Sequence, residues 1–144
     1  MNRPSARLLQ DAKAQGILFS DDNKTLLWCP LDVVGAVVIP PCVTRIGKAA
    51  FERCTALTGV MIPDSVTEIG YSAFDGCDHL RRVTIPGSVE RIGRGAFLAC
   101  PLTEVSIPER AEVGKKVFPD TCRVIRRAYA PVPLTAADIS PEKS

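Results

Sequence analysis

The chain has 144 residues, of which 46% are hydrophobic, and this is enough apolar content for one domain with a core of ordinary size. Its 18 basic and 16 acidic residues are spread along the chain and give a formal net charge of +2, which excludes a strong overall attraction to nucleic acid or to an anionic membrane. No window is apolar enough for a membrane span, and the first residues lack the apolar segment of a secretory signal, so the chain as written is predicted to be cytoplasmic.

Residues 1–33 precede the repeated segment 34–122 and are predicted to form its N-terminal cap, because the first and last coils of a repeat protein need their apolar faces covered. A helix of about ten residues is expected between Ser5, as its N-cap, and Gly16, as its terminator. The apolar side of that helix would cover the first repeat and consists of Leu8, Leu9 and Ala12. A hairpin follows, with a polar turn supplied by Asp21, Asp22 and Asn23.

Residues 34–122 repeat with a fixed period. Aligned on their Ile-Pro dipeptides, the units that start at Ile39 and Ile62 have 23 residues each, and the unit that starts at Ile85 has 22. Self-similarity at such a period predicts a solenoid, here of about four coils. The same seven slots are apolar in three successive coils, at Val34, Val37, Ile39, Val43, Ile46, Ala50 and Phe51, then Leu57, Val60, Ile62, Val66, Ile69, Ala73 and Phe74, then Leu80, Val83, Ile85, Val89, Ile92, Ala96 and Phe97.

Each repeat is predicted to contain two short extended pieces and a turn. Runs such as LRRVTIP suit a strand that pairs with adjacent coils, and the proline that follows would end it, at Pro40, Pro63, Pro86 and Pro108. A second piece such as VTEIG ends in a glycine that supplies a positive φ or a close backbone approach, at Gly47, Gly70, Gly93 and Gly114. A segment such as YSAFDGC is predicted to form a helical or 3₁₀ turn, whose phenylalanines stack in a ladder.

The fourth repeat is predicted to be a degenerate terminal coil. It begins with Leu102, Val105 and Ile107, but Val113 and Phe118 arrive one place early. Residues 123–130 are predicted to form a C-terminal capping strand, and residues 131–144 a flexible tail.

The pattern LxxVxIPxSVxxIGxxAFxxC over residues 34–122 resembles the BspA-like, or Treponema-pallidum-type, leucine-rich repeats. The resemblance implies a curved, mainly β solenoid with a parallel sheet on its concave face, preceded here by the N-terminal helix. It also implies a non-enzymatic protein-interaction or adhesion module, and family members are often secreted or at the cell surface. Its motifs are structural and imply no catalytic residues.

Four of the six cysteines follow the repeat, namely Cys54, Cys77, Cys100 and Cys122, with gaps of 23, 23 and 22 residues. A periodic slot favours a structural role, in which a buried thiol acts as a small hydrophobic group and weak donor. Cys29 and Cys42 fall outside the ladder. They would form a disulfide only if they lay side by side across the hairpin, so their redox state stays open.

The sequence contains no motif for catalysis, metal binding or a cofactor. The single histidine, His79, lies in a loop and would need Cys77 or Cys100, both predicted to be buried, as a nucleophilic partner. No CxxC pair, GxxxxGK[ST] loop or GxGxxG loop is present. We therefore predict no enzymatic activity, no catalytic or metal-binding residues and no cofactor.

The candidate binding surface follows from the predicted concave sheet, because strand positions between the apolar slots face that side in leucine-rich repeats. This surface would bind a protein of unknown identity or a second copy of the chain, and the alternative is a solvated face on a purely structural module. Its candidate residues are Val38, Met61, Arg81, Arg82, Thr84, Glu104 and Ser106.

A second candidate function is binding of a polyanion or nucleic acid through basic residues near the C-terminus. Neighbouring acidic residues, Glu109, Glu112 and Asp120, dilute this charge, and few aromatic residues are interleaved for base stacking. The candidate basic patch consists of Arg110, Lys115, Lys116, Arg123, Arg126 and Arg127.

Overall fold

The computed structural model describes residues 3–128, with the backbone alone described for residues 3–5. The predicted tail at 131–144 and the last residues of the predicted capping strand, 129–130, lie outside the described residues. Between residues 3 and 128, no helix is long and apolar enough to cross a membrane.

The described chain contains one helix and a series of short strands. Their bounds are α1 Arg3–Ala14, β1 Leu18–Phe19, β2 Thr25–Trp28, β3 Gly35–Val38, β4 Arg45–Ile46, β5 Leu57–Met61, β6 Glu68–Ile69, β7 Arg82–Thr84, β8 Arg91–Ile92, β9 Glu104–Pro108, β10 Glu112–Val113 and β11 Arg123–Arg127.

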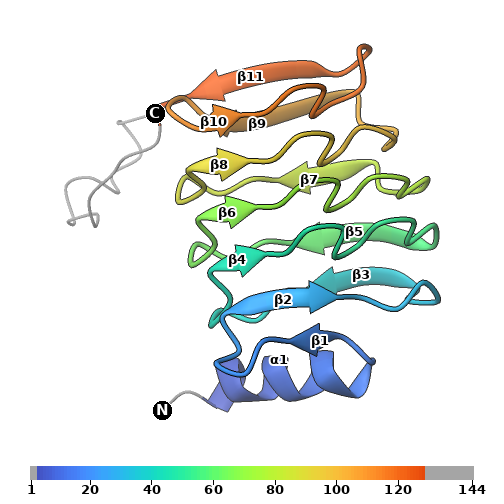
Figure 1. Ribbon diagram of the computed structural model, residues 1–144, viewed down its shortest axis with the longest axis vertical. Helices are drawn as coiled ribbons and strands as arrows, with labels where there is room; N and C mark the ends of the chain where they lie inside the picture. The colour runs from blue at the N-terminus through green and yellow to red at the C-terminus, as the bar shows by residue number, and fades with distance from the viewer. Residues whose placement is uncertain (1–2, 129–144) are drawn as a thin grey trace, which may run out of the picture.

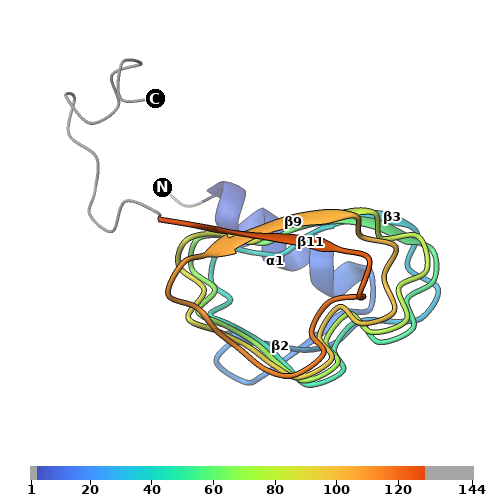
Figure 2. The same ribbon diagram turned by 90° about the horizontal axis from the view of Figure 1, so that it is seen from above.

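The strands stack into a solenoid with two opposite walls (Figure 1). In one wall β3, β5 and β7 pair in parallel, and β9 and β11 follow as a separate parallel pair. In the other wall β2, β4, β6, β8 and β10 pair in parallel, with β1 antiparallel to β2 at the edge. Seen along the axis, the coils superpose into a ring with β9 and β11 on one side and β2 on the other (Figure 2). The predicted mainly β solenoid is confirmed.

Stacked phenylalanine rings run through the core, as the repeat predicts. Phe51 and Phe74 have ring centroids 4.8 Å apart, and Phe74 and Phe97 have centroids 4.9 Å apart, with nearly parallel planes. These three rings are fully buried, and burying each contributes about 1.5–3 kcal/mol. Phe118 extends the ladder at 5.6 Å from Phe97, so its early position in the sequence does not remove it from the phenylalanine column.

The apolar slots are buried in the three predicted coils, with one exception at the first position. Val34 is 78% exposed, whereas the other twenty residues of the predicted pattern are buried. Val33 is packed against the core instead. The strand register shifts beside it, since Gly35 pairs with Leu57 but Ala36 pairs with Gly59, and Gly35 takes a positive φ of 83°.

The repeated glycines serve close packing rather than a left-handed turn. None of Gly47, Gly70, Gly93 and Gly114 has a positive φ. A Cβ atom on Gly93 would lie 2.7 Å from the Tyr71 backbone nitrogen, and one on Gly114 would lie 2.7 Å from the Arg94 backbone nitrogen. The second of the two predicted roles, close approach between coils, is therefore the correct one.

The segments around the phenylalanines are runs of turns, as predicted, and no longer helix forms there in the described residues. Hydrogen bonds of the 3₁₀ type, from residue i to residue i−3, close these turns, as when the Cys54 amide donates to the Phe51 carbonyl at 3.2 Å. Other backbone groups bond across coils, as when the Phe51 amide donates to the Ala73 carbonyl at 2.7 Å, and this pairing prevents a longer helix. One position of these turns has a positive φ in every coil, at Ala49, Ser72, Gly95 and Lys116.

Helix α1 lies across the N-terminal end of the stack (Figure 1). It begins at Arg3, so Ser5 is inside its first turn and is not the predicted N-cap. Gly16 ends it as predicted, with a φ of 93°. The Gly16 amide donates to Lys13 and the Ile17 amide to Ala12, and both Ala12 and Ile17 are buried.

Candidate binding surfaces

The first candidate surface is the outward side of β3, β5, β7, β9 and β11, called the strand face below. Strand register places Val38 beside Met61 and Met61 beside Thr84. Val38 is 39% exposed and Met61 is 64% exposed, so the β3–β5 half presents an apolar surface to solvent. Because side chains alternate along a strand, the neighbouring buried slots hold these side chains outward.

The other half of the strand face is polar. The side chains of Arg82 and Glu104 are exposed, and Arg123 reaches toward Glu104 with an N–O distance of 4.0 Å. The Arg127 guanidinium donates to the Ser106 hydroxyl at 2.9 Å. A hollow of about 400 Å³ lies where β7 and β9 are adjacent but belong to different sheets, and it is lined by Arg82, Val83, Thr84, Glu104, Val105, Ser106 and Arg127.

All the candidate residues of the predicted concave surface therefore occur in or beside the strand-face strands. Arg81 is exposed and directly precedes β7. The remaining six, in strand order, are Val38 in β3, Met61 in β5, Arg82 and Thr84 in β7, and Glu104 and Ser106 in β9.

The residues of the candidate basic patch are divided among different places. Arg123 and Arg127 belong to the strand face, whereas the Arg126 guanidinium donates to the carbonyls of Glu109 and Ala111 at 2.9 and 3.1 Å. Lys116 lines a separate hollow of about 330 Å³ with Lys48 and Tyr71. Arg110 and Lys115 are exposed. Three of the six basic groups are thus already engaged by neighbouring protein atoms.

A groove that the sequence analysis did not identify runs along the opposite wall. It has a volume of about 610 Å³ and is called the outer groove below. It crosses four coils, and each contributes a charged residue, an apolar strand residue and a glycine. Its lining residues are Arg45, Ile46, Gly47, Lys48, Glu68, Ile69, Gly70, Tyr71, Arg91, Ile92, Gly93, Arg94, Glu112, Val113 and Gly114.

The two columns of side chains that border the outer groove were visible in the repeat. Arg45, Glu68, Arg91 and Glu112 occupy one slot in successive coils, and Lys48, Tyr71 and Arg94 occupy another. Reading the polar slots by the same period as the apolar ones would have placed them side by side. Whether the two columns enclose a groove depends on the path of the backbone between them. The sequence pattern does not specify that path.

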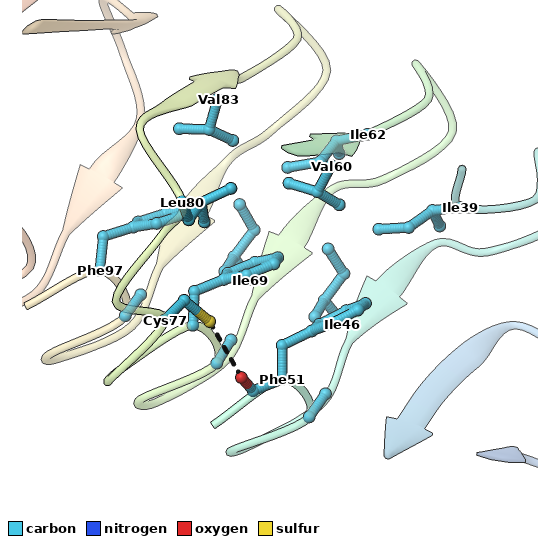
Figure 3. Close-up of a cluster of buried hydrophobic side chains, with 14 of the residues drawn as sticks. Ile39, Ile46, Phe51, Val60, Ile62, Ile69, Cys77, Leu80, Val83 and Phe97 are labelled. Carbon is cyan, nitrogen blue, oxygen red and sulfur yellow. Dashed lines mark hydrogen bonds between the residues drawn. The ribbon is translucent and has the colours of Figure 1, made fainter. Parts of the chain in front are cut away.

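The buried cysteines are structural donors. The Cys77 thiol donates to the Phe51 carbonyl at 3.1 Å (Figure 3), and the Cys100 thiol donates to the Phe74 carbonyl at 3.0 Å. The Cys100 thiol, together with burial, raises the pKa of the Cys77 thiol, which keeps it protonated and unreactive. The predicted role of the periodic slot is confirmed at these two positions.

Cys54 follows the same scheme, because its buried thiol donates to the carbonyls of Cys29 and Pro30 in the lead-in at 3.8 and 3.6 Å. The other three cysteines depart from it. Cys29 takes a phenylalanine place in the lead-in, since its amide donates to the Ala50 carbonyl at 2.7 Å as the Phe51 amide donates to that of Ala73. Cys29 is buried and Cys42 is exposed, and both are free thiols, so the conditional disulfide does not form. Cys122 is only partly buried, and its thiol contacts the Arg123 carbonyl at 3.8 Å instead of a carbonyl in the preceding coil.

Among residues 3–128 no group of three or more His, Cys, Asp or Glu residues is arranged to hold a metal ion. His79, which sequence analysis placed in a loop, is exposed and its Nδ1 lies 2.7 Å from the Thr55 carbonyl oxygen. The side chain therefore contacts the preceding coil.

Comparison with known proteins identifies one family. The BspA type leucine rich repeat region matches residues 32–135 in six copies. No match was found among curated proteins.

Solved structures with a similar fold belong to longer proteins. A leucine-rich repeat protein from Bacteroides ovatus is 30% identical with a TM-score of 0.64, over 77% of this chain and 32% of the other. A leucine-rich repeat protein of T. pallidum is 27% identical with a TM-score of 0.63, over 79% of this chain and 62% of the other. The pneumococcal vaccine antigen PcpA, 19% identical with a TM-score of 0.66 over 78% of this chain and 33% of the other, shares the fold. The chain thus spans about a third to under two thirds of these proteins.

Proposed function

Because this chain belongs to the BspA-type leucine-rich repeat family, we propose that it is a non-catalytic protein-binding or adhesion module and that the strand face is its contact surface. The observation that carries the proposal is the exposed pair Val38 and Met61. These side chains lie in adjacent strands and remain 39% and 64% exposed. Neighbouring apolar side chains on a regular sheet surface mark a contact site, because their burial against a partner is favourable.

The polar half of the strand face supplies the specificity of such a contact. Arg82, Glu104 and Arg127 lie on the same strand face as the apolar pair, and they carry both signs of charge. An apolar centre beside a polar margin is the usual composition of a protein interface. Uniform attraction to a polyanion is less favourable here, since Glu104 lies among the arginines.

The size of the strand face sets the expected affinity. Five strands at about 4.8 Å spacing and about 15 Å length present on the order of 300 Å². A stable interface buries about 800 Å² of accessible surface on each partner, so contact through this face alone is expected to be weak and transient. Contacts from loops or from further repeats would be needed for a tighter complex.

The proposal is tested by partner capture from the native source with matched surface variants. Immobilised wild-type protein, a Met61→Glu/Arg82→Ala variant and a Leu27→Glu/Arg110→Ala control are compared by quantitative mass spectrometry, after circular dichroism has verified folding. Leu27 and Arg110 are also exposed, but Leu27 lies on β2 in the other wall and Arg110 follows β9. We expect partners to be lost from the Met61→Glu/Arg82→Ala variant alone. Equal recovery by all three proteins would sink the proposal.

Self-association through the same face is the second possibility within this proposal. Sedimentation equilibrium over a range of concentrations measures it directly, and the Met61→Glu change would abolish a dimer built on the strand face by placing two like charges in contact. A concentration-dependent mass that this variant leaves unchanged would assign the dimer to another surface.

A further inference from the structure

The strands that line the outer groove, β4, β6, β8 and β10, form the wall opposite the strand face (Figures 1 and 2), so a ligand there would not compete with a strand-face partner. We propose that the outer groove is a second binding surface, and that it takes an extended acidic peptide segment of a partner protein. Three observations carry this inference: the balance of charge, the arrangement of free cations and the nature of the floor.

The first border of the groove, formed by the column Arg45, Glu68, Arg91 and Glu112, carries equal numbers of positive and negative charges. Arg45 and Glu68 form an ion pair at 3.3 Å, and Arg91 and Glu112 form another at 3.5 Å. Each pair joins neighbouring strands of one sheet, so the four charges alternate along the groove. This border therefore attracts neither sign strongly, and its carboxylates disfavour a ligand with dense, uniform negative charge.

The opposite border carries the excess positive charge. Lys48 and Arg94 line it, and neither forms an ion pair with a carboxylate of the described residues. Tyr71 lies between them in the stack, 57% exposed, and the Lys48 ammonium is 5.8 Å from the centre of its ring. The same three residues line the adjacent hollow of about 330 Å³, where Lys116 adds a further positive charge and Asp75 contributes one carboxylate. This border presents a basic and aromatic strip.

The floor of the groove is backbone with little polar surface. It consists of the buried strand residues and of the glycines that follow them, such as Ile69 and Gly70. Since the glycines pack against the preceding coil, no side chain fills the space between the two borders. A bound chain can thus approach the backbone closely, and apolar side chains of the ligand would be sheltered from water.

The spacing of the cations fits an extended peptide. Successive coils are 4.8–4.9 Å apart, as the phenylalanine ladder measures. Lys48 and Arg94 are two coils apart, which places them roughly 10 Å from each other along the axis. In a polyproline II segment, residues i and i+3 lie on one side about 9.3 Å apart. Two carboxylates at that spacing would face the two cations. The residues between them point toward the other two sides of the helix, so an apolar one can rest on the floor of the groove while the Tyr71 ring contacts the ligand backbone.

A fluorescein-labelled peptide of about twelve residues in repeating Glu-Pro-Leu units is a suitable probe, because it combines this spacing with the polyproline II conformation. Fluorescence anisotropy with the full chain is expected to show saturable binding that weakens as salt rises. A peptide of repeating Lys-Pro-Leu units serves as the matched ligand control and is expected not to bind.

Variants then assign the site. Arg94→Glu and Tyr71→Ala are each expected to weaken binding of the acidic peptide about tenfold, which corresponds to about 1.4 kcal/mol. Arg110→Glu makes the same charge reversal outside the groove and is expected to leave binding unchanged. The Met61→Glu/Arg82→Ala variant should also bind the peptide normally, so failure of the strand-face proposal and failure of this one are distinguishable.

Each alternative outcome overturns the inference. Absence of peptide binding to the wild-type chain removes it, as does binding that Arg94→Glu and Tyr71→Ala leave intact. Equal or tighter binding of heparin or of a single-stranded oligonucleotide, with displacement of the peptide, would replace the peptide by a polyanion as the ligand.

Discussion

The middle coils and the last coil bury the same kinds of side chain on different lengths of backbone. In a middle coil, Cys77 and Leu80 are three positions apart, whereas the equivalent Cys100 and Leu102 of the last coil are two positions apart. The last coil lacks a second residue between Ala111 and Val113. Leu102, Val105 and Ile107 are nevertheless buried like their counterparts. Both losses fall between apolar slots, which indicates that the solenoid tolerates deletions there while the slots themselves stay in place.

The shorter coil differs from the middle coils in how it is held. Its strand β9 pairs with β11 but belongs to a different sheet from β7, and its ring Phe118 is 5.6 Å from Phe97. At the end of the stack, the Arg126 guanidinium donates hydrogen bonds to two carbonyls of this coil. The middle of the stack is thus held by regular apolar packing, whereas the end has a wider ring spacing and more exposed residues.

Loss of a ring should destabilise the middle more than the end. Phe74→Ala is expected to lower the free energy of unfolding by about 3–5 kcal/mol, because the ring is fully buried between two others. Phe118→Ala is expected to lower it by about half as much, since that ring is partly buried and stacks on Phe97. Urea denaturation measures both. Equal losses would show that the last coil is as well packed as the middle.

Thiol labelling should report the same difference without a mutation. Cys77 is fully buried with a raised pKa, so it should react with iodoacetamide only after the middle of the stack opens. Burial, and then the nearby Glu104 charge, also raise the pKa of the Cys122 thiol, but this residue is partly buried in the last coil. We expect Cys122 to be labelled about a hundredfold faster than Cys77, and exposed Cys42 to react at once. Pulse labelling with peptide mass spectrometry decides the order.

A methyl group added at a glycine between coils should also be tolerated better in the last coil than in the middle of the stack. Gly93→Ala would place Cβ 2.7 Å from a backbone nitrogen and is expected to cost about 1–3 kcal/mol. Gly114→Ala creates an equally close contact, but the last coil can shift away from it, so a smaller loss is expected. Gly59→Ala is the control, since its Cβ would meet its nearest neighbour, the Ala36 Cβ, at 3.7 Å. A loss in Gly59→Ala as large as in Gly93→Ala would contradict the packing argument.

The smallest effect is expected for the polar closure of the stack. Arg126→Met keeps much of the side-chain stem but removes both hydrogen bonds to carbonyls, and it should lower stability by about 1 kcal/mol. Hydrogen exchange should become faster in β11, while β5 stays unchanged. Faster exchange throughout both strands would mean that Arg126 stabilises the whole stack instead of its end.

The sequence by itself determined the solenoid and most of its core. A 23-residue period with fixed apolar slots allows few other arrangements, because a slot that is apolar in every coil must face the interior when identical coils stack. Reading those slots identified twenty buried positions, the phenylalanine ladder and the outward positions of the strand face.

Only the tertiary structure decided the features that depend on contacts between particular coils. Val34 is exposed because a register shift at Gly35 brings Val33 to the core, and Phe118 joins the ladder because the lost residues lie in the links between slots. The outer groove requires both borders and the glycine floor to be placed in space. A repeat pattern specifies which residues are equivalent, but the shape between two columns of equivalent residues follows from the path of the backbone, which the pattern leaves undetermined.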